Sequence, residues 1–459
     1  MLALTGLAYL ASVTFNLFYT IGDIYVLFIP SYLLLILWLA IGVGCLVTPL
    51  RARPIVAGLV AVLLFALPLW TAASHYPEVD QSQNRQARAR WEAILAEPLP
   101  PDAILISNDR NNIMPMWYFQ YVDGMRPDLL GLFPLITPEY PSLGHVLDLA
   151  LSTGRPAYLI KEMPGAEVKV EVEAEGGLWR VVGQAADGEP AYATSAHLED
   201  KVALLGYERS PRSPQPGGSL QVALYWEALR PLEEQYHSFV HLRDGQGQVV
   251  AQSDRQPGGV HYPTSLWRPG EQLRDDHTLS IPADADEGVY ELWVGMYTLT
   301  SDGDLVPLAE PVRAGQVAIK ASTQTGPGPI GTPISASFDE QIELLGYDAG
   351  VQEGALEVVL HWRSIQPATT DYTVFLHVVD ASGQVVAQHD SQPQGGAYPT
   401  SVWNADEVIR TEHTLLLPPD LPEGDYHLRV GLYLLDTGRR LSVEGDGDSI
   451  ELGPINPKE

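Results

Sequence analysis

The sequence predicts a multidomain protein with N-terminal transmembrane α-helices, a small α/β domain, and two tandem β-sandwiches of immunoglobulin or fibronectin-like type. Three observations predict this organisation. Long uncharged apolar runs are confined to residues 1–74, short apolar runs alternate with helical segments over 75–197, and a segment with apolar residues at every second position occurs twice after residue 197. The length of 459 residues leaves room for about three domains of roughly 150 residues each.

Charge separates the N-terminal segment from the rest of the chain. Residues 1–74 contain Asp23, Arg51 and Arg53 as their only charged side chains, whereas the remainder has 25 Lys and Arg against 56 Asp and Glu, a net charge of −31. Nucleic acid and anionic lipid require positive charge at the contact, so we expect neither as a partner of the acidic part. The single cysteine, Cys45, lies in an apolar run and allows no disulfide.

Three stretches of the N-terminal segment are expected to form transmembrane helices, at about 2–18, 29–48 and 54–72. The second and third have about 20 uncharged residues each, which at 1.5 Å per residue match a hydrocarbon core of about 30 Å. The first is barely long enough to span. It has no Lys or Arg ahead of its apolar core, so it is a poor secretory signal.

The short connection between the second and third stretches indicates the topology. It contains Arg51 and Arg53, which favour the cytoplasmic side. Three further arginines, at positions 85, 88 and 90, oppose this placement, but we give the tight hairpin more weight. We therefore expect a multi-pass protein of the plasma membrane, in contact with the lipid bilayer, with the bulk of the chain extracytoplasmic.

Asp23 is the only acidic residue among the first 77 and lies between aromatic residues. A carboxylate at membrane depth is costly and indicates function, whereas one at the water interface costs little. Two interpretations stay open: Asp23 belongs to an interfacial loop that caps the helix beginning at Ile29, or it is a weak catalytic candidate.

Two extended patterns carry a resemblance to a known family: NLFYTIGDIYVLFIPSYL over 16–33, and ILISNDRNNIMPMWYFQYVDGMRPDLL over 104–130. With the intervening spans they resemble the C-terminal part of an uncharacterised bacterial membrane family related to protein O-mannosyltransferases, which are GT-C-fold, lipid-phosphosugar-dependent glycosyltransferases. The resemblance covers about residues 10–165. It implies a polytopic enzyme whose catalytic acidic residues lie in an early extracytoplasmic loop ahead of these patterns.

The resemblance also implies a substrate cleft at the membrane face. Its bordering residues would be Asn16, Tyr19, Tyr25 and Tyr32, with a polyprenyl-phosphate sugar as donor and a glycan or protein as acceptor. No cofactor is evident, and a divalent cation is expected only in the complete enzyme. Because the catalytic loop is not among these residues, we expect no catalysis from this chain alone.

The pattern over residues 75–197 predicts an extracytoplasmic α/β domain. We expect helices at 80–96, 114–122 and 143–151, strands at 103–107, 129–133 and 157–161 that form a small parallel sheet, and a closing edge strand or hairpin at 178–183. Asn108, Asp109 and Arg110 directly follow the first strand, where ligands of parallel sheets bind. The alternative is a tight turn in which a side-chain oxygen caps the next helix.

An internal repeat dominates the chain after residue 197. LLGYE at 204–208 returns as LLGYD at 344–348, and after a four-residue contraction the spacing is 136 residues, as for YPTS at 262–265 and 398–401. Within each copy apolar residues alternate and turn signals recur about every ten residues, which is typical of β-sandwiches. The expected ranges are 198–320 and 336–455, joined by a Gly/Pro/Ser/Thr linker at 321–335.

The sandwiches offer one candidate ligand site. Trp267 and Trp403 follow the Tyr-Pro-Thr-Ser turns and could form an aromatic platform for a sugar ring, although an aromatic residue in a sandwich is more often part of the core. His241 and His277 lack a second ligand at metal spacing, so we expect no zinc site.

Two functions follow from these patterns. The first is the C-terminal portion of a membrane-embedded, glycosyltransferase-like protein with an extracytoplasmic β-sandwich tail. The alternative is a membrane-anchored surface protein whose β-sandwiches serve in adhesion or carbohydrate binding.

Overall fold

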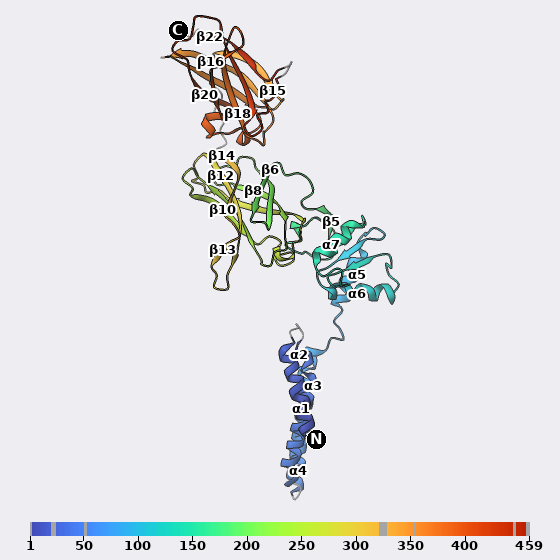
Figure 1. The fold of residues 1–459 in the computed structure, drawn as a ribbon. Helices are drawn as coiled ribbons and strands as arrows, with labels where there is room; N and C mark the ends of the chain where they lie inside the picture. Colours follow the sequence, from blue (N-terminus) through green and yellow to red (C-terminus); the bar gives the residue numbers. More distant parts are fainter. Residues whose placement is uncertain are drawn as a thin grey trace. The chain divides into compact units, whose positions relative to one another are not determined.

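The computed structural model describes residues 2–19, 24–49, 53–320, 328–352, 354–443 and 447–455. The chain divides into two compact units, Met1–Ala87 and Arg88–Glu459, and each is described by itself (Figure 1). Three of the sequence predictions fall outside the described residues: Asp23, Arg51, and residues 321–327 at the start of the expected linker.

The first unit consists of apolar helices. They are α1 (Leu2–Phe18), α2 (Ile24–Leu27), α3 (Ile29–Val47) and α4 (Pro54–Val79). Three hydrogen bonds join α1 to the α2–α3 segment: Trp38 Nε1 to Thr5 Oγ1 at 2.8 Å, Ser31 Oγ to Ser12 Oγ at 3.1 Å, and Asn16 Nδ2 to the Leu27 carbonyl at 2.8 Å. The order of these contacts shows that α1 and α3 run antiparallel.

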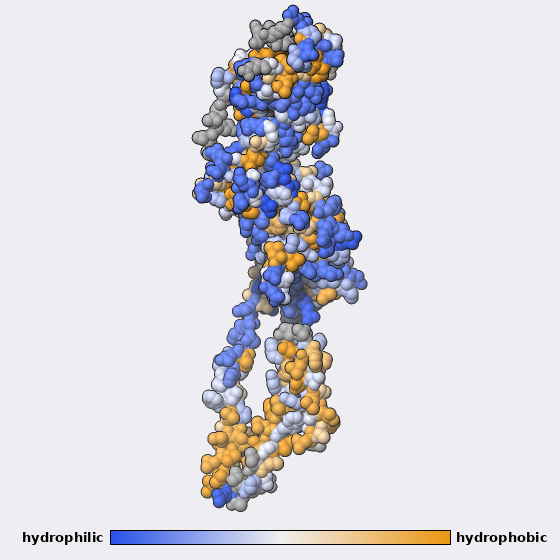
Figure 2. Space-filling view, turned by 60° about the vertical axis from the view of Figure 1, so that its left-hand side comes forward, coloured by the Kyte–Doolittle hydropathy of each residue, from blue (hydrophilic) through white to orange (hydrophobic). Residues whose placement is uncertain are grey.

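One helix of the described residues, α4, is long and apolar enough to cross a membrane by length and composition. None of its residues is buried, and Figure 2 shows hydrophobic residues gathered over the helices of this unit. The expected span at 54–72 lies within α4, which continues to Val79. The other two expected spans form α1 and α3. However, Leu2–Phe18 and Ile29–Cys45 are too short to meet the same test, so the multi-pass arrangement stays a prediction.

The second unit begins with the α/β domain, whose sheet has the order β2-β1-β3-β5-β4. Its elements are α5 (Gln86–Ala96), β1 (Ile104–Ile106), α6 (Arg110–Tyr121), β2 (Leu130–Leu132), α7 (Leu143–Ser152), β3 (Ala157–Leu159), the 3₁₀ turn η2 (Ala166–Val168), β4 (Val170–Glu175) and β5 (Leu178–Gln184). Leu105 packs with residues of α5 and α6, whereas Ile104 and Ile106 pack with α7. Alternation along β1 therefore places α5 and α6 on one face of the sheet and α7 on the other.

Two expectations for this domain need correction. The sheet is mixed, because β5 pairs antiparallel with β3 after the parallel strands β1, β2 and β3. Of the two alternatives for 178–183, the hairpin is the one observed: β5 pairs with β4, which lies at the edge of the sheet. The helix expected at 80–96 begins only at Gln86, because Asp80 ends α4 as its C-cap and leaves a short break before α5.

Each repeat forms two antiparallel sheets. The first has β11-β8-β7-β6 against β10-β9-β12-β13, with β14 also paired to β12; the second has β15-β16-β17-β20 against β19-β18-β21-β22. The strands of the first are β6 (Tyr192–Leu198), β7 (Val202–Ser210), β8 (Ser219–Ala228), β9 (His237–Arg243), β10 (Val249–Arg255), β11 (Gln272–Ser280), β12 (Gly288–Leu299), β13 (Leu305–Pro307) and β14 (Val312–Ile319). Those of the second are β15 (Thr332–Phe338), β16 (Ile342–Gln352), β17 (Ala355–Ser364), β18 (Tyr372–Asp380), β19 (Val385–Ser391), β20 (Val408–Leu416), β21 (Tyr426–Leu434) and β22 (Ile450–Ile455).

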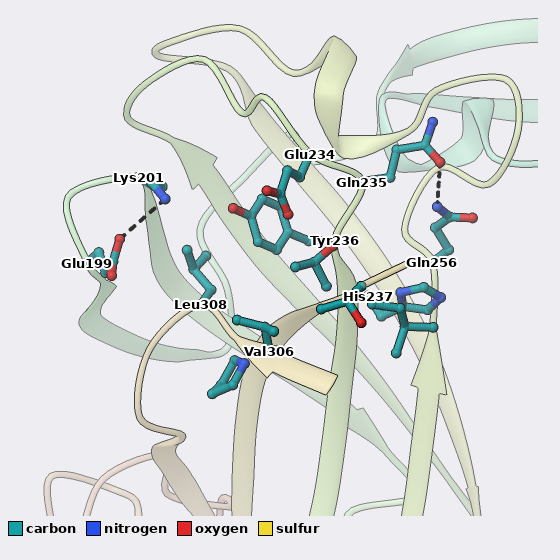
Figure 3. Close-up of a pocket in the computed structure, with 13 residues that line it drawn as sticks. Glu199, Lys201, Glu234, Gln235, Tyr236, His237, Gln256, Val306 and Leu308 are labelled. Atoms are coloured by element: carbon teal, nitrogen blue, oxygen red, sulfur yellow. Dashed lines mark hydrogen bonds and ion pairs between the residues drawn. The ribbon is translucent and has the colours of Figure 1, made fainter. Parts of the chain in front are cut away.

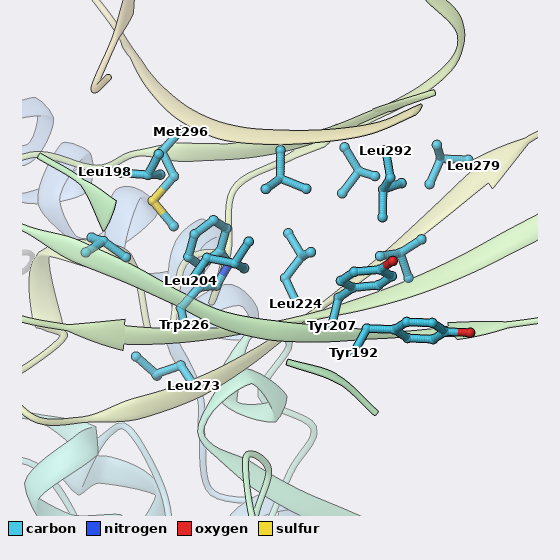
Figure 4. Packing of buried hydrophobic residues seen from close by; sticks show 14 of the residues in the cluster. Tyr192, Leu198, Leu204, Tyr207, Leu224, Trp226, Leu273, Leu279, Leu292 and Met296 are labelled. Carbon is cyan, nitrogen blue, oxygen red and sulfur yellow. The ribbon is translucent and has the colours of Figure 1, made fainter. Parts of the chain in front are cut away.

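The core of each sandwich lies between its two sheets. In the first, Leu224 and Trp226 of β8 pack with Leu292 and Met296 of β12 (Figure 4). Trp362 takes the place of Trp226 in the second core. The alternating apolar residues thus form sandwich cores, whereas the immunoglobulin or fibronectin-like assignment stays a prediction.

Both sandwiches begin earlier than expected. β6 pairs with β7 from Tyr192, six residues before the expected boundary at 198, and β15 pairs with β16 from Thr332, inside the expected linker. The repeated LLGY stretch is the second strand of each module, and the less similar first strand precedes it.

Candidate functional site

The structure gives Asp109 the capping role. Its side chain accepts a hydrogen bond from the Asn111 backbone N–H at 2.8 Å, and its own N–H donates to Ser107 Oγ at 3.2 Å. Arg110 is the first residue of α6 and is exposed, and Asn108 is half-buried. These three residues form a strand-to-helix turn at the end of β1, and no described contact joins them into a ligand site.

The residues expected at the membrane face have separate surroundings. Asn16 is buried, and its amide donates to the Leu27 carbonyl, so it holds α1 against the end of α2. Tyr19 stacks on Phe15, and Tyr32 stacks on Phe28, with ring centroids 5.1 and 6.3 Å apart. Tyr19, Tyr25 and Tyr32 are all exposed.

The aromatic platform expected at Trp267 and Trp403 is wrong. The two side chains are 2% and 0% exposed, respectively, and belong to the hydrophobic cores of their sandwiches. Each is the C-cap of a 3₁₀ turn, and because both rings are buried, neither offers a face to a sugar.

The repeated Tyr-Pro-Thr-Ser turn has a structural explanation. Thr264 Oγ1 accepts from the Tyr236 N–H at 2.8 Å and donates to the Glu234 carbonyl at 3.0 Å. In the second copy, Thr400 makes the same two bonds, at 2.9 and 2.7 Å, to Tyr372 and Thr370. A buried threonine therefore pins the loop that enters β9 or β18, which explains why the motif recurs.

A Ser–His–Asp cluster in the first sandwich is likewise structural. Ser238 Oγ lies 2.5 Å from Asp275 Oδ2 and 3.0 Å from His277 Nε2. All three residues are at most 1% exposed, so no substrate reaches the serine. In the second copy, Val374 and Thr411 replace the serine and the aspartate. The cluster is a buried polar network of the core, in which Asp275 Oδ1 has no hydrogen-bond partner and lies 3.6 Å from Arg255 Nε.

An open cleft of about 740 Å³ lies at one end of the first sandwich (Figure 3). It is bounded by the β6–β7 turn, the loop before β9, the residue after β10, and the β12–β13 hairpin. The lining residues are Glu199, Lys201, Glu234, Gln235, Tyr236, His237, Gln256, Thr298, Leu299, Thr300, Val306, Pro307 and Leu308. Its volume is within the range of about 300–1,000 Å³ for small-molecule sites.

The cleft combines charged, amide and apolar groups. Lys201 Nζ lies 3.4 Å from Glu199 Oε2, and Gln256 Nε2 donates to Gln235 Oε1 at 2.9 Å. Burial opposes the charge of Lys201, but Tyr236 and Glu199 outweigh it and raise the pKa of the lysine. Figure 3 shows Tyr236 between these two pairs. The lysine therefore stays charged at neutral pH, and the cleft presents donors and acceptors in fixed positions.

Two kinds of reactive arrangement are relevant to this cleft: a nucleophile paired with a base, and a cluster of side chains that could hold a metal. Among the lining residues no serine, threonine or cysteine is paired with a base, and the described part of the chain contains no group of three or more His, Cys, Asp or Glu side chains that could hold a metal. No family model matches this chain. The curated proteins contain no match either. The chemistry of the cleft is therefore argued from its own residues.

Tyr236 and Gln256 of the cleft recur in the second copy as Tyr372 and Gln392, whereas five other lining residues differ between the two copies. Glu199, Lys201, Glu234, Gln235 and His237 correspond to Asp339, Gln341, Thr370, Asp371 and Thr373. Positions that agree in the two copies build the common fold, whereas a function of one copy belongs at positions that differ. Loop positions that differ in this way are the signal that could have revealed the cleft.

Proposed function

We propose that this protein is a membrane-anchored surface protein whose first β-sandwich binds a neutral carbohydrate in the cleft beside Tyr236. The observation that carries the proposal is the pairing of a polar wall with an apolar wall in one cleft. Glu234, Gln235 and Gln256 supply acceptors and donors, and Val306, Pro307 and Leu308 supply apolar surface.

A sugar ring has hydroxyl groups along its edge and C–H groups on its faces. Burying the hydroxyls costs free energy unless each finds a hydrogen-bond partner, and carboxylates and amides provide such partners at fixed positions. The C–H faces bind apolar side chains such as those of the β12–β13 hairpin. Two glutamates against one lysine disfavour an anionic ligand, so the proposal is limited to neutral glycans.

The membrane part of the proposal rests on α4 and on the distribution of charge. In this proposal α1 and α3 accompany α4 in the bilayer as a multi-pass anchor, and the acidic second unit lies outside the cell. The supporting observations are the exposed apolar side chains of the first unit and the absence of acidic residues other than Asp23 before Glu78.

Glycan-array binding of the full chain in detergent tests the carbohydrate site. We expect binding to neutral glycans, weakened about tenfold or more by Glu234→Gln, because a hydrogen bond to a charged group contributes about 1.5–3 kcal/mol. Thr370→Ala changes the equivalent position of the second sandwich and is the matched control. No binding to any neutral glycan, or equal binding by the two variants, would remove the proposal.

A second candidate is the C-terminal portion of a lipid-phosphosugar-dependent glycosyltransferase, related to O-mannosyltransferases. Its support is the sequence resemblance together with the exposed tyrosines 19, 25 and 32, which flank the connection that contains Asp23. A polyprenyl-phosphate photoprobe in nanodiscs tests it. The probe should label residues 15–32 of the full chain, and Tyr25→Ala should reduce the labelling; labelling spread evenly over α4 would contradict a specific lipid site.

A further inference from the structure

A buried lysine joins the α/β domain to the first sandwich within the unit Arg88–Glu459. Lys169 follows η2 and is 5% exposed. Its ammonium group contacts the carboxylate of Glu271 and lies 2.8 Å from Asp148 Oδ1. The same nitrogen lies 5.5 Å from the ring centroid of Tyr262. The cation is thus held by two carboxylates and an aromatic ring.

The sandwich itself positions the Glu271 carboxylate. The Tyr262 hydroxyl donates to its two oxygens at 2.7 and 2.9 Å, and the Arg268 backbone N–H donates to Oε2 at 2.9 Å. All three residues belong to the turn between β10 and β11. The acceptor is therefore oriented by groups of its own module, independently of the lysine.

The second sandwich repeats this arrangement with a lysine from the first. Lys320 directly follows β14, and its Nζ donates to Glu407 Oε2 at 2.6 Å and to the Val402 carbonyl at 3.1 Å. It lies 4.8 Å from the ring centroid of Tyr398. The Tyr398 hydroxyl donates to Glu407 at 2.5 Å, and the Asn404 N–H donates at 2.7 Å.

The sockets occupy equivalent positions of the repeat, but the two lysines do not. Tyr262, Arg268 and Glu271 are each separated by 136 residues from Tyr398, Asn404 and Glu407. Lys169 comes from a turn of the α/β domain and Lys320 from the end of a β-strand. The chain contains only five lysines, at positions 161, 169, 201, 320 and 458, and two of them occupy equivalent sockets in successive modules.

We propose that the tyrosine–glutamate socket of each β-sandwich is a recognition surface for a lysine ammonium group of the module that precedes it in the chain. The partner is defined by its chemistry: a compact cation on a flexible stem, which fits over a tyrosine ring and against one carboxylate. An arginine fork is wider and planar and matches this site less well. The socket therefore fixes the junction between successive modules.

Lys320 and Glu407 are both largely buried, so the loss of either charge would be costly for the other. The side chains of Lys320 and Glu407 are 19% and 12% exposed, so removal of one partner leaves the other charge with little water. Further bonds at this junction, from Arg209 and Arg212 to backbone carbonyls of residues 401–403, hold the same turn.

Acetylation of lysines by an N-hydroxysuccinimide ester, followed by mass spectrometry of the full chain, tests the proposal. Lys201, whose side chain is 38% exposed, is the internal reference. We expect Lys169 and Lys320 to react about tenfold more slowly than Lys201, since reaction requires a local opening of the junction. Burial lowers the pKa of Lys320, although Glu407 opposes this shift. A lower pKa by itself would make the amine react faster. Slow acetylation of Lys320 would therefore show that the ammonium group is held in its socket.

Two variants separate the sockets. Glu407→Gln keeps an acceptor for Tyr398 but removes the charge. It should raise the acetylation rate of Lys320 several-fold and leave that of Lys169 unchanged. Glu271→Gln should raise the acetylation rate of Lys169 several-fold and leave that of Lys320 unchanged. Glu412→Gln, on the exposed face of β20, is the matched control. Unchanged near-UV circular dichroism shows that the sandwiches stay folded. Reaction of Lys169 and Lys320 at the rate of Lys201, or no response of Lys320 to Glu407→Gln, would overturn the proposal.

Discussion

His277 and His413 occupy the same position of the two sandwiches and are both buried, but they have different partners. His277 Nε2 lies 3.0 Å from the buried carboxylate of Asp275, whereas His413 Nε2 lies 3.0 Å from the hydroxyl of Thr411. Burial opposes ionisation of Asp275, yet His277 and Arg255 outweigh it and lower the pKa of Asp275. The change from Asp275 to Thr411 thus replaces a buried carboxylate beside the histidine by a hydroxyl group.

Protonation of His413 is unfavourable in the folded protein. Burial, with a smaller contribution from the neighbouring His389, lowers its pKa from 6.5 to about 4. Between these two values the unfolded chain binds a proton that the folded chain does not bind. The contribution of the neutral His413 to the free energy of unfolding is therefore fully present above about pH 6.5. It decreases as the pH falls and stops decreasing near pH 4.

We predict that the second sandwich of the full chain is about 3 kcal/mol less stable at pH 4 than at pH 7 on account of His413, since each pKa unit corresponds to about 1.4 kcal/mol. Hydrogen exchange of β17 and β20 measured in urea at several pH values checks this. His413→Gln should flatten the dependence between pH 6.5 and 4. An equal pH dependence in the variant would show that other groups cause it.

At the scale of the element, each sandwich has an irregularity in its second strand. The register shifts between Leu204 and Gly206 in β7, and between Leu344 and Gly346 in β16. A Cβ on Gly346 would lie 2.5 Å from the Thr332 carbonyl oxygen and one on Gly206 2.4 Å from that of Tyr192. The glycine of the repeated LLGY motif therefore lets the first strand approach at the bulge.

We predict that Gly346→Ala lowers the free energy of unfolding of the second sandwich by about 1–3 kcal/mol, because the added methyl group meets backbone that cannot give way. Gly350→Ala, in the same strand, is the matched control, since a methyl group added at that position would have open space within 4 Å. Thermal unfolding of the full chain measures both. Equal effects of the two substitutions would mean that the bulge does not require glycine.

At the scale of the whole molecule, the chain separates an apolar unit from an acidic one. Figure 2 shows hydrophilic residues spread over the second unit. The charge beyond residue 74, a net −31, keeps this part soluble and disfavours its contact with anionic lipid. The connection before α4 contains two arginines instead of acidic residues, and this positive charge favours the cytoplasmic side for that connection.

We predict that a membrane-impermeant maleimide labels Ser301→Cys, in the exposed turn after β12, on intact cells that produce the full chain. Arg53→Cys, just before α4, should react only after permeabilisation, because the positive-inside bias places that end in the cytoplasm. The single native cysteine, Cys45, keeps the background low. Labelling of Arg53→Cys but not of Ser301→Cys on intact cells would reverse the topology.

Local patterns were sufficient to predict much of the fold. The helices at α1, α3, α6 and α7 and the strands β1 to β3 lie within or close to the expected ranges, because apolar periodicity reflects burial directly. The antiparallel pairing of β5 with β3 and the positions of β6 and β15 in their sandwiches were missed. Strand order and pairing depend on contacts between distant segments, which local periodicity does not contain.

The sequence by itself determined the division into an apolar and an acidic part, the duplication, and the alternation that builds each sandwich, because composition and periodicity act locally along the chain. Only the tertiary structure decided which repeated residues are core, as for Trp267 and Trp403, and which loops converge to form the cleft. It also brought Lys169 and Lys320, which are far apart in the chain and do not correspond to each other in the repeat, to equivalent sockets. Burial and charge pairing are properties of three-dimensional neighbours, and folding alone determines those neighbours.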